Sequence, residues 1–376
     1  MDKEVIPGLE GVPIAESAIS RVDGAAGKLE YRGVSVEQLA DLGTFEETSW
    51  LLLYGELPTA DELAAFTREM AGYRRLKYRV IDLIKCLPET GHPMDALQAA
   101  VAAIGMFYPT PRDLDDAAKK SACMRLIAKL PSVVAAFERI RRGDEHILPR
   151  TDLGHAANFL YMLTGDEPDV ERTHVLDVCL ILHADHTMNA STFAGRVVGS
   201  TLADPYCVVS SALGALSGPL HGGANETAMA LFREIGSPEN ARPVIEKMIA
   251  EKAKIPGFGH RVYRTIDPRA KVLKTFAKSL ADKSGNPECA IANEVEKVMA
   301  EHYGEKGIWP NVDLYSGIVY NELGIPAECF TPIFAISRVA GWLAHWLEQR
   351  IGNRIFRPTQ KYVGKSDRSY TPMNQR

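Results

Sequence analysis

Apolar residues recur at helical spacing along most of this chain. Between residues 39 and 53 they fall on one side of a helix, and the Gly55-Glu56-Leu57-Pro58 segment that follows is typical of a helix end. A second helix is predicted directly afterwards, because Thr59 and Glu62 form a capping pair ahead of further apolar residues at helical spacing. Residues 39–70 therefore predict a helical hairpin.

Alanine-rich apolar runs at residues 96–105 and 117–137 predict further helices that can pack closely together. Only the first 35 residues, in which glycines separate alternating apolar residues, indicate short strands and turns. The pattern as a whole favours a mainly α fold. After Gly218-Pro219 the chain becomes rich in Gly, Lys and Arg as far as about residue 310, which indicates an inserted second domain.

Composition argues against several classes of protein. The 376 residues include 43 Lys and Arg against 48 Asp and Glu, and this net charge of −5 argues against a nucleic-acid scaffold. The six cysteines form no C-x-x-C pair, so we expect no structural zinc site, no disulfide framework and a cytoplasmic location. The longest apolar stretch, residues 175–182, is far shorter than the roughly 20 residues that cross a bilayer, so no membrane anchor is expected.

Two histidines lie at the end of an apolar helical segment. His183 and His186 are three residues apart and are predicted to share one helical face. The simplest interpretation is a pair of core or capping histidines held by hydrogen bonds. A zinc site is the weaker alternative, because the spacing differs from that of a metalloprotease helix and no third ligand is indicated.

A third histidine, His221, is followed by Gly222 and Gly223 and then by a predicted helix. The two glycines would let a ligand approach the ring and the backbone together. The positive end of the helix dipole disfavours a charged imidazole, so His221 is expected to stay neutral and to donate to a developing oxyanion. A plain turn before a helix cap explains the same segment equally well.

A fourth histidine, His260, lies in a basic loop. Four cations follow it within twelve residues, a density that suits phosphate or carboxylate recognition, although a solvated basic face is the alternative. Asp267 and Pro268 are typical of the N-cap and first position of a helix. The loop lacks the third glycine and the preceding strand of a dinucleotide-binding fingerprint.

Three more candidate functional residues lie outside the histidine segments. Asp313 precedes an apolar helix and could serve only as its cap. Arg338 shares a predicted helix with aromatic residues, and Arg357 follows near the C-terminus. An arginine in such surroundings either pairs with an acid or extends its charge to water, and the second outcome is the commoner.

Taken together, six segments in order resemble the citrate synthase family over almost the whole chain. They are HADH…NAST at 183–192, PLHGGAN at 219–225, GFGHRVY…DPRA at 257–270, NVDLYSG at 311–317, ISRVAGW at 336–342 and RPTQKYVG at 357–364. The resemblance implies an enzyme, an acyltransferase that condenses acetyl-CoA with oxaloacetate and hydrolyses the citryl thioester to citrate and CoA. It also implies a large helical domain (residues 1–222 and 325–376), a smaller helical domain (residues 223–324) and an active site in the cleft between them.

The roles that the resemblance implies meet specific chemical needs. A thioester methyl group is a very weak acid, so a carboxylate base, Asp313, needs a donor such as neutral His221 to stabilise the enolate. His260 would serve the oxaloacetate carbonyl oxygen. The substrate carboxylates would be held by His186 and three arginines, namely Arg269, Arg338 and, from the partner subunit of a homodimer, Arg357.

The resemblance assigns the CoA nucleotide to the loop around His260. The implied CoA-binding residues are Lys254, Ile255, Pro256, Gly257, Phe258, Gly259 and Arg264. CoA would be a cosubstrate, with no tightly bound cofactor and no metal. A cleft that closes over both substrates would protect the thioester from premature hydrolysis.

Some features depart from the family pattern or leave alternatives open. Thr187 and Met188 replace residues that are often acidic or polar, and the NADH-responsive site of the larger bacterial enzymes is missing, which favours a compact homodimer. A 2-methylcitrate synthase using propionyl-CoA has the same catalytic set, since one methyl group gives only about 1–3 kcal/mol of discrimination. A non-catalytic CoA-binding module and a histidine metal protein are the alternatives from other classes.

Overall fold

The computed structural model describes residues 5–109 and 115–376, and these residues are mainly helical. The N-terminal segment contains the strands of the described residues, β1 (Ser20–Asp23), β2 (Lys28–Tyr31) and β3 (Val34–Ser35), which pair antiparallel in that order. The side chain of Asp23 accepts from the backbone of Ala25 and Ala26 and so forms the turn between the first two strands. The short strands expected near the N-terminus are therefore confirmed.

Sixteen α-helices follow within the described residues. The first ten are α1 (Val36–Leu42), α2 (Phe45–Tyr54), α3 (Ala60–Tyr73), α4 (Tyr78–Lys85), α5 (Pro93–Phe107), α6 (Asp116–Arg141), α7 (His155–Thr164), α8 (Val170–His183), α9 (Ala190–Ser200) and α10 (Pro205–Leu216). The remaining six are α11 (Ala224–Ile235), α12 (Pro238–Ala250), α13 (Pro268–Ser284), α14 (Glu288–Tyr303), α15 (Asp313–Glu322) and α16 (Phe330–Arg350). Short 3-10 turns are found at Pro7–Leu9, Gly304–Lys306, Ala327–Cys329 and Met373–Gln375.

The predicted hairpin needs one correction. Residues 39–53 form two helices rather than one, because Thr44 and Glu47 make a complete capping box that begins α2 just after α1 ends. The second predicted start is confirmed, since Thr59 and Glu62 form the same reciprocal pair at the beginning of α3. Asp267 and Pro268 likewise cap and open α13 as expected.

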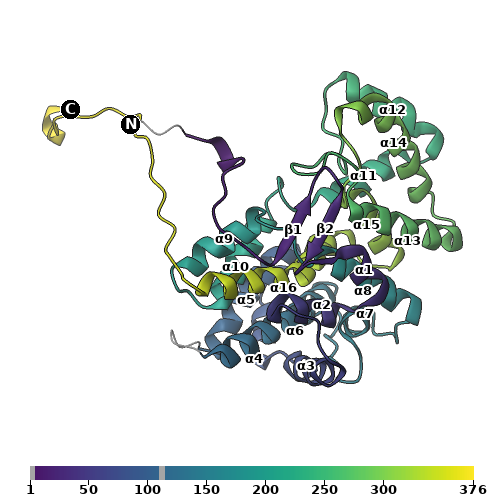
Figure 1. The fold of residues 1–376 in the computed structure, drawn as a ribbon, viewed down its shortest axis with the longest axis horizontal. Helices are drawn as coiled ribbons and strands as arrows, with labels where there is room; N and C mark the ends of the chain where they lie inside the picture. Colours follow the sequence, from purple (N-terminus) through teal and green to yellow (C-terminus); the bar gives the residue numbers. More distant parts are fainter. Residues whose placement is uncertain (1–4, 110–114) are drawn as a thin grey trace.

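The long helix α16 lies at the centre of the fold. It is buried along most of its length and packs against α2, α6, α8, α9 and α10 (Figure 1). Helices α11 to α15 gather at one end of the molecule and pack mainly on one another. The core therefore consists of a layered helical body, with the α11–α15 group attached beside α16 and α8.

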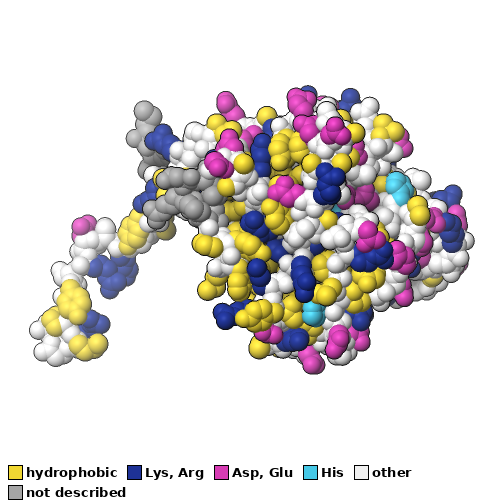
Figure 2. Space-filling model, turned by 90° about the horizontal axis from the view of Figure 1, so that it is seen from below, with side chains coloured by type: hydrophobic (Ala, Val, Ile, Leu, Met, Phe, Trp, Pro, Cys, Tyr) yellow, Lys and Arg dark blue, Asp and Glu magenta, His cyan; other side chains and the backbone are white. Residues whose placement is uncertain are grey.

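Both ends of the chain leave the body. Residues after 356 are exposed and extended, and in Figure 1 this C-terminal arm runs outward on the same side as the N-terminal segment. Figure 2 shows that basic, acidic and apolar side chains are interspersed on the face seen there. Among the described residues, no helix combines the length and the hydrophobicity that crossing a bilayer requires.

Candidate active site

A cleft of about 780 Å³ lies where α16 and the α8–α9 turn meet the α11–α15 group. Eleven of the residues singled out from the sequence line it: His186, His221, Lys254, Pro256, Gly257, Phe258, Gly259, His260, Arg269, Asp313 and Arg338. They come from segments spread over more than 150 positions of the chain. The fold thus brings carboxylate, imidazole and guanidinium groups to one place.

Backbone hydrogen bonds join the His260 loop to the segment that precedes α15. The amide of Gly259 donates to the carbonyl oxygen of Trp309 at 2.9 Å, and the amide of Asn311 donates to that of Gly257 at 2.9 Å. The Asn311 side chain adds a hydrogen bond to the Gly259 carbonyl oxygen at 2.9 Å and caps the amide of Asp313 at 3.0 Å. His260 and Asp313 are therefore held on one rigid support although they are far apart in sequence.

The surroundings of His221 keep its ring neutral. Its Nε2 accepts from the backbone N–H of Ser191 at 3.2 Å, in the first turn of α9, so the proton of the neutral ring lies on Nδ1. Burial, reinforced by the charge of Arg338, lowers the pKa of His221 to about 4. The helix end that contacts the ring is therefore that of α9. The expectation that Gly222 leaves space for a ligand is wrong, because the Leu216 carbonyl oxygen lies where its side chain would be.

The protonated nitrogen of His260 is fixed in the same manner. Its Nδ1 accepts from the backbone N–H groups of Val262 at 3.0 Å and Tyr263 at 3.2 Å, which leaves Nε2 as the donor. Burial and the nearby charge of Arg269 lower the pKa of His260 to about 4. Two of the three imidazoles that line the cleft, His221 and His260, are therefore uncharged and have a defined donor.

Asp313 is the first residue of α15 and is only half-buried. No described side chain or backbone amide donates to its carboxylate. Burial raises the pKa of Asp313 to about 6, although the charges of Arg269, Arg338 and Lys254 oppose this rise. Such a carboxylate is a stronger base than an ordinary surface aspartate and is still ionised at neutral pH.

Arg269 is buried and paired with the cap residue of its own helix. Its Nε and Nη2 donate to the two carboxylate oxygens of Asp267 at 3.0 and 2.7 Å. The N-cap role expected for Asp267 is confirmed, since it also accepts from the backbone of Arg269 at 3.0 Å. Asp267 therefore both begins α13 and fixes the direction of the Arg269 guanidinium.

The expectation that the charge of Arg338 reaches water is wrong. The residue is 1% exposed, its Nε donates to the carbonyl oxygen of His183 at 2.6 Å, and Nη2 has no partner among the described residues. Burial lowers the pKa of Arg338 to about 10, so the side chain is still a cation at neutral pH. An interior cation that borders a cleft and lacks a paired carboxylate is suited to an anionic ligand.

The two histidines of the 183–192 segment have separate surroundings. Helix α8 ends at His183, so the expectation that both rings share one helical face is wrong. His183 is in the core, with Nδ1 2.7 Å from the Cys179 carbonyl oxygen, whereas the Nε2 atom of His186 lies 3.3 Å from the Tyr263 hydroxyl at the cleft. Within the described residues, no group of three or more His, Cys, Asp or Glu side chains could hold a metal ion.

Three predicted site residues do not line this cleft. Ile255 is buried in the hydrophobic core, Arg264 is exposed outside the cleft, and Arg357 lies on the C-terminal arm. The cleft residues to which sequence reasoning gave no role include Asn189, Asn225, Asn311, Thr331 and Phe334. The three asparagines lie inside the quoted segments, so a search for side-chain amides beside the histidines would have found them.

Comparison with known proteins supports a single family. Residues 8–359 match the family described as citrate synthase, C-terminal domain. The citrate synthase of Synechocystis sp. is 56% identical over all of this chain and 95% of its own length. Among solved structures, the citrate synthase of Pyrobaculum aerophilum superposes with a TM-score of 0.93 at 45% identity, covering 99% of this chain and 95% of its own. A ternary complex of the Thermoplasma acidophilum citrate synthase with carboxymethyl coenzyme A and oxaloacetate superposes with a TM-score of 0.94 at 36% identity. This match covers 99% of this chain and 100% of the other. This chain belongs to the citrate synthase family.

Proposed function

We propose that this enzyme condenses acetyl-CoA with oxaloacetate and hydrolyses the resulting citryl thioester to citrate and CoA. The observation that carries the proposal is the composition of the cleft, where one carboxylate base and two neutral imidazole donors face buried guanidinium groups. The relative from Thermoplasma acidophilum, crystallised with a CoA analogue and oxaloacetate, supports the same substrate pair.

The first step needs a base and a donor on either side of the acetyl group. Asp313 removes a proton from the methyl carbon while the Nδ1–H of His221 donates to the thioester oxygen. This hydrogen bond stabilises the negative charge that develops on the oxygen as the enolate forms. A neutral donor suits this role, because its proton stays shared with the oxygen and is not lost to it.

The second step forms the carbon–carbon bond. The nucleophilic carbon attacks the oxaloacetate carbonyl carbon, and the Nε2–H of His260 donates to the oxygen on which charge develops. His186, Arg269 and Arg338 hold the two carboxylates in place, as charge-assisted hydrogen bonds would do. Water then cleaves the citryl thioester, which releases CoA as a thiol.

The remaining predicted residues would bind the CoA nucleotide or take part in a homodimer. The backbone of residues 254–259 and the exposed Arg264 would bind the CoA nucleotide, with CoA as cosubstrate. The exposed C-terminal arm would carry Arg357 to the cleft of a second copy in a homodimer. Residues 223–324 would act as a small domain that closes on residues 1–222 and 325–376.

A thiol-release assay tests the proposal directly. The enzyme should release free CoA from acetyl-CoA only when oxaloacetate is present, with a higher kcat/KM for acetyl-CoA than for propionyl-CoA. A preference for propionyl-CoA would instead make the protein a 2-methylcitrate synthase, and tight CoA binding without release of thiol would contradict catalysis altogether.

A further inference from the structure

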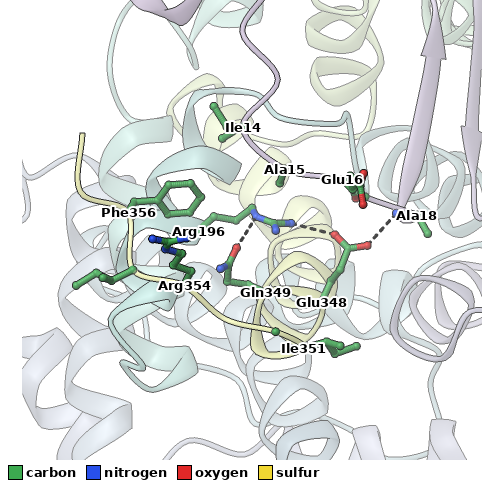
Figure 3. A pocket seen from close by; sticks show the side chains of 13 residues that line it. Ile14, Ala15, Glu16, Ala18, Arg196, Glu348, Gln349, Ile351, Arg354 and Phe356 are labelled. Atoms are coloured by element: carbon green, nitrogen blue, oxygen red, sulfur yellow. Dashed lines mark hydrogen bonds and ion pairs between the residues drawn. The ribbon is translucent and has the colours of Figure 1, made fainter. Parts of the chain in front are cut away.

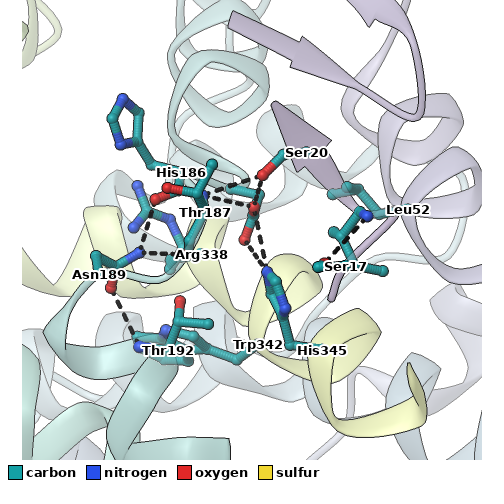
Figure 4. A network of polar contacts seen from close by, with 12 residues as sticks. Ser17, Ser20, Leu52, His186, Thr187, Asn189, Thr192, Arg338, Trp342 and His345 are labelled. Carbon is teal, nitrogen blue, oxygen red and sulfur yellow. Dashed lines mark hydrogen bonds and ion pairs between the residues drawn. The ribbon is translucent and has the colours of Figure 1, made fainter. Parts of the chain in front are cut away.

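A buried aspartate connects three elements behind the cleft. Asp185 is fully buried in the turn between α8 and α9. Its Oδ2 accepts from the Ser20 hydroxyl at 2.5 Å, from the backbone N–H of Thr187 at 3.0 Å and from Nε2 of His345 at 3.4 Å (Figure 4). Its Oδ1 lies 3.3 Å from the same Nε2 and has no hydrogen-bond partner among the described residues. Strand β1, the α8–α9 turn and α16 therefore meet at one carboxylate.

Arg196, on the other side of His345, fixes the direction of the hydrogen bond between His345 and Asp185. Nδ1 of His345 lies 3.3 Å from Nη1 of Arg196, and because a guanidinium can only donate, Nδ1 accepts and Nε2 carries the proton toward Asp185. Arg196 also donates to Glu348 at 3.0 Å and to Gln349 at 3.1 Å, and Glu348 accepts from the amide of Ala18 at 2.8 Å (Figure 3). Three donors thus converge on Oδ2 of Asp185, and the amide nitrogen of an asparagine in the place of Oδ1 would lie 3.3 Å from one of them, Nε2 of His345.

The turn around Asp185 carries one of the groups proposed to face the substrate anion, His186, and contacts another, Arg338 of α16. His186 is the next residue, and Thr187 beyond it has a left-handed φ of 50°, a conformation that its hydrogen bond to Asp185 helps to hold. On the other side, Arg338 donates to the His183 carbonyl oxygen at 2.6 Å, and Gly341 donates to the Ala184 carbonyl oxygen at 3.1 Å. A small shift of this turn would move His186 and Arg338 relative to each other.

We propose that Asp185 is a positioning residue for the oxaloacetate site, and that Ser20 on β1 and His345 on α16 act through it. The inference rests on the proposed function. It gives the N-terminal strand a part in substrate binding, although strand β1 contributes no residue to the cleft wall. Fold stability alone is a weak explanation, because a buried carboxylate stabilises a fold no better than well-packed apolar groups do.

The variant Asp185→Asn tests the inference, because charge and geometry predict opposite results. Removing a negative charge behind the site should by itself strengthen binding of a dianion. If Asp185 acts by positioning, the KM for oxaloacetate should instead rise about tenfold or more, while the KM for acetyl-CoA changes less than about twofold. The matched control is Asp204→Asn, since the Asp204 carboxylate likewise accepts from backbone amides, those of Tyr206 and Cys207, but caps α10 outside this network.

A milder pair of variants covers the case in which Asp185→Asn does not fold. Ser20→Ala removes one donor and leaves the carboxylate, so the KM for oxaloacetate should rise about threefold, whereas Ser20→Thr keeps the hydroxyl and should retain the wild-type value. An unchanged or lowered KM for oxaloacetate in the Asp185 and Ser20→Ala variants would overturn the inference. So would equal losses for both substrates in proportion to a lowered Tm. Failure of the wild-type protein to release thiol would refute the proposed function itself and the inference with it.

Discussion

At the scale of single residues, backbone amides decide which ring nitrogen of each cleft histidine carries the proton. Ser191 donates to one ring nitrogen of His221, and Val262 and Tyr263 donate to one of His260, so each imidazole presents one fixed donor. Asp313 is the opposite case, because no described group donates to it and burial raises its pKa to about 6. The site keeps its acidic and basic functions on different residues by giving them different partners.

The first prediction concerns the base. Asp313→Asn should lower kcat for thiol release by on the order of 10²–10⁴-fold, because an amide cannot accept the methyl proton. The folded-state pKa of Asp313 lies above its ordinary value, so the ionised side chain opposes folding at neutral pH, and the variant should melt no lower than wild type. Measured kcat and Tm values check both parts, and undiminished turnover would exclude Asp313 as the base.

The second prediction is a pH dependence. Asp313 must be ionised to act, and its pKa is about 6, so kcat/KM should fall about tenfold per pH unit as the pH drops below 6. His221 and His260 have pKa values of about 4 and stay neutral over most of this range. A rate profile that is flat down to pH 5 would contradict the assignment.

At the scale of elements, sequence patterns predicted well wherever a local hydrogen bond sets the boundary. The Thr59–Glu62 and Asp267–Pro268 signals were correct because capping depends on three or four neighbouring residues. The break between α1 and α2 and the end of α8 at His183 were missed, because hydrophobic spacing continues across both. The burial of Arg338 was also missed, since it depends on packing against the distant α8–α9 turn.

The third prediction concerns the contact between α16 and that turn. A methyl group added at Gly341 would lie 2.3 Å from Asp185 Oδ1 and 2.4 Å from the Ala184 carbonyl oxygen. Gly341→Ala should therefore destabilise the fold by about 1–3 kcal/mol, as measured by urea unfolding. The control is Gly72→Ala in α3, where the added methyl group meets nothing within 4 Å and helix propensity favours alanine. Equal stability of the two variants would refute the close packing.

At the scale of the whole molecule, the site lies where two groups of helices meet. Arg338 and His186 belong to the helical body, whereas His260, Arg269 and Asp313 belong to the α11–α15 side. The six sequence segments identified this set, but no local pattern could give their distances. Those distances depend on how the α11–α15 group packs beside α8 and α16.

The fourth prediction follows from the proposed two-domain arrangement. Oxaloacetate should draw the two sides together, because one dianion would contact cations on both. Small-angle X-ray scattering should then show a smaller radius of gyration at saturating oxaloacetate than without it. Identical scattering curves in the two conditions would argue against closure.

The burial of Arg338 without an ion pair among the described residues has a consequence for the life of the protein in a cell. A buried positive charge whose Nη2 has no hydrogen-bond partner among the described residues penalises the vacant fold, and a bound dianion would remove that penalty and add its own binding energy. The free energy of unfolding, and with it the resistance of the protein to proteolysis, should therefore rise with the concentration of oxaloacetate. A cell short of oxaloacetate would not only run this enzyme slowly but also retain fewer copies of it.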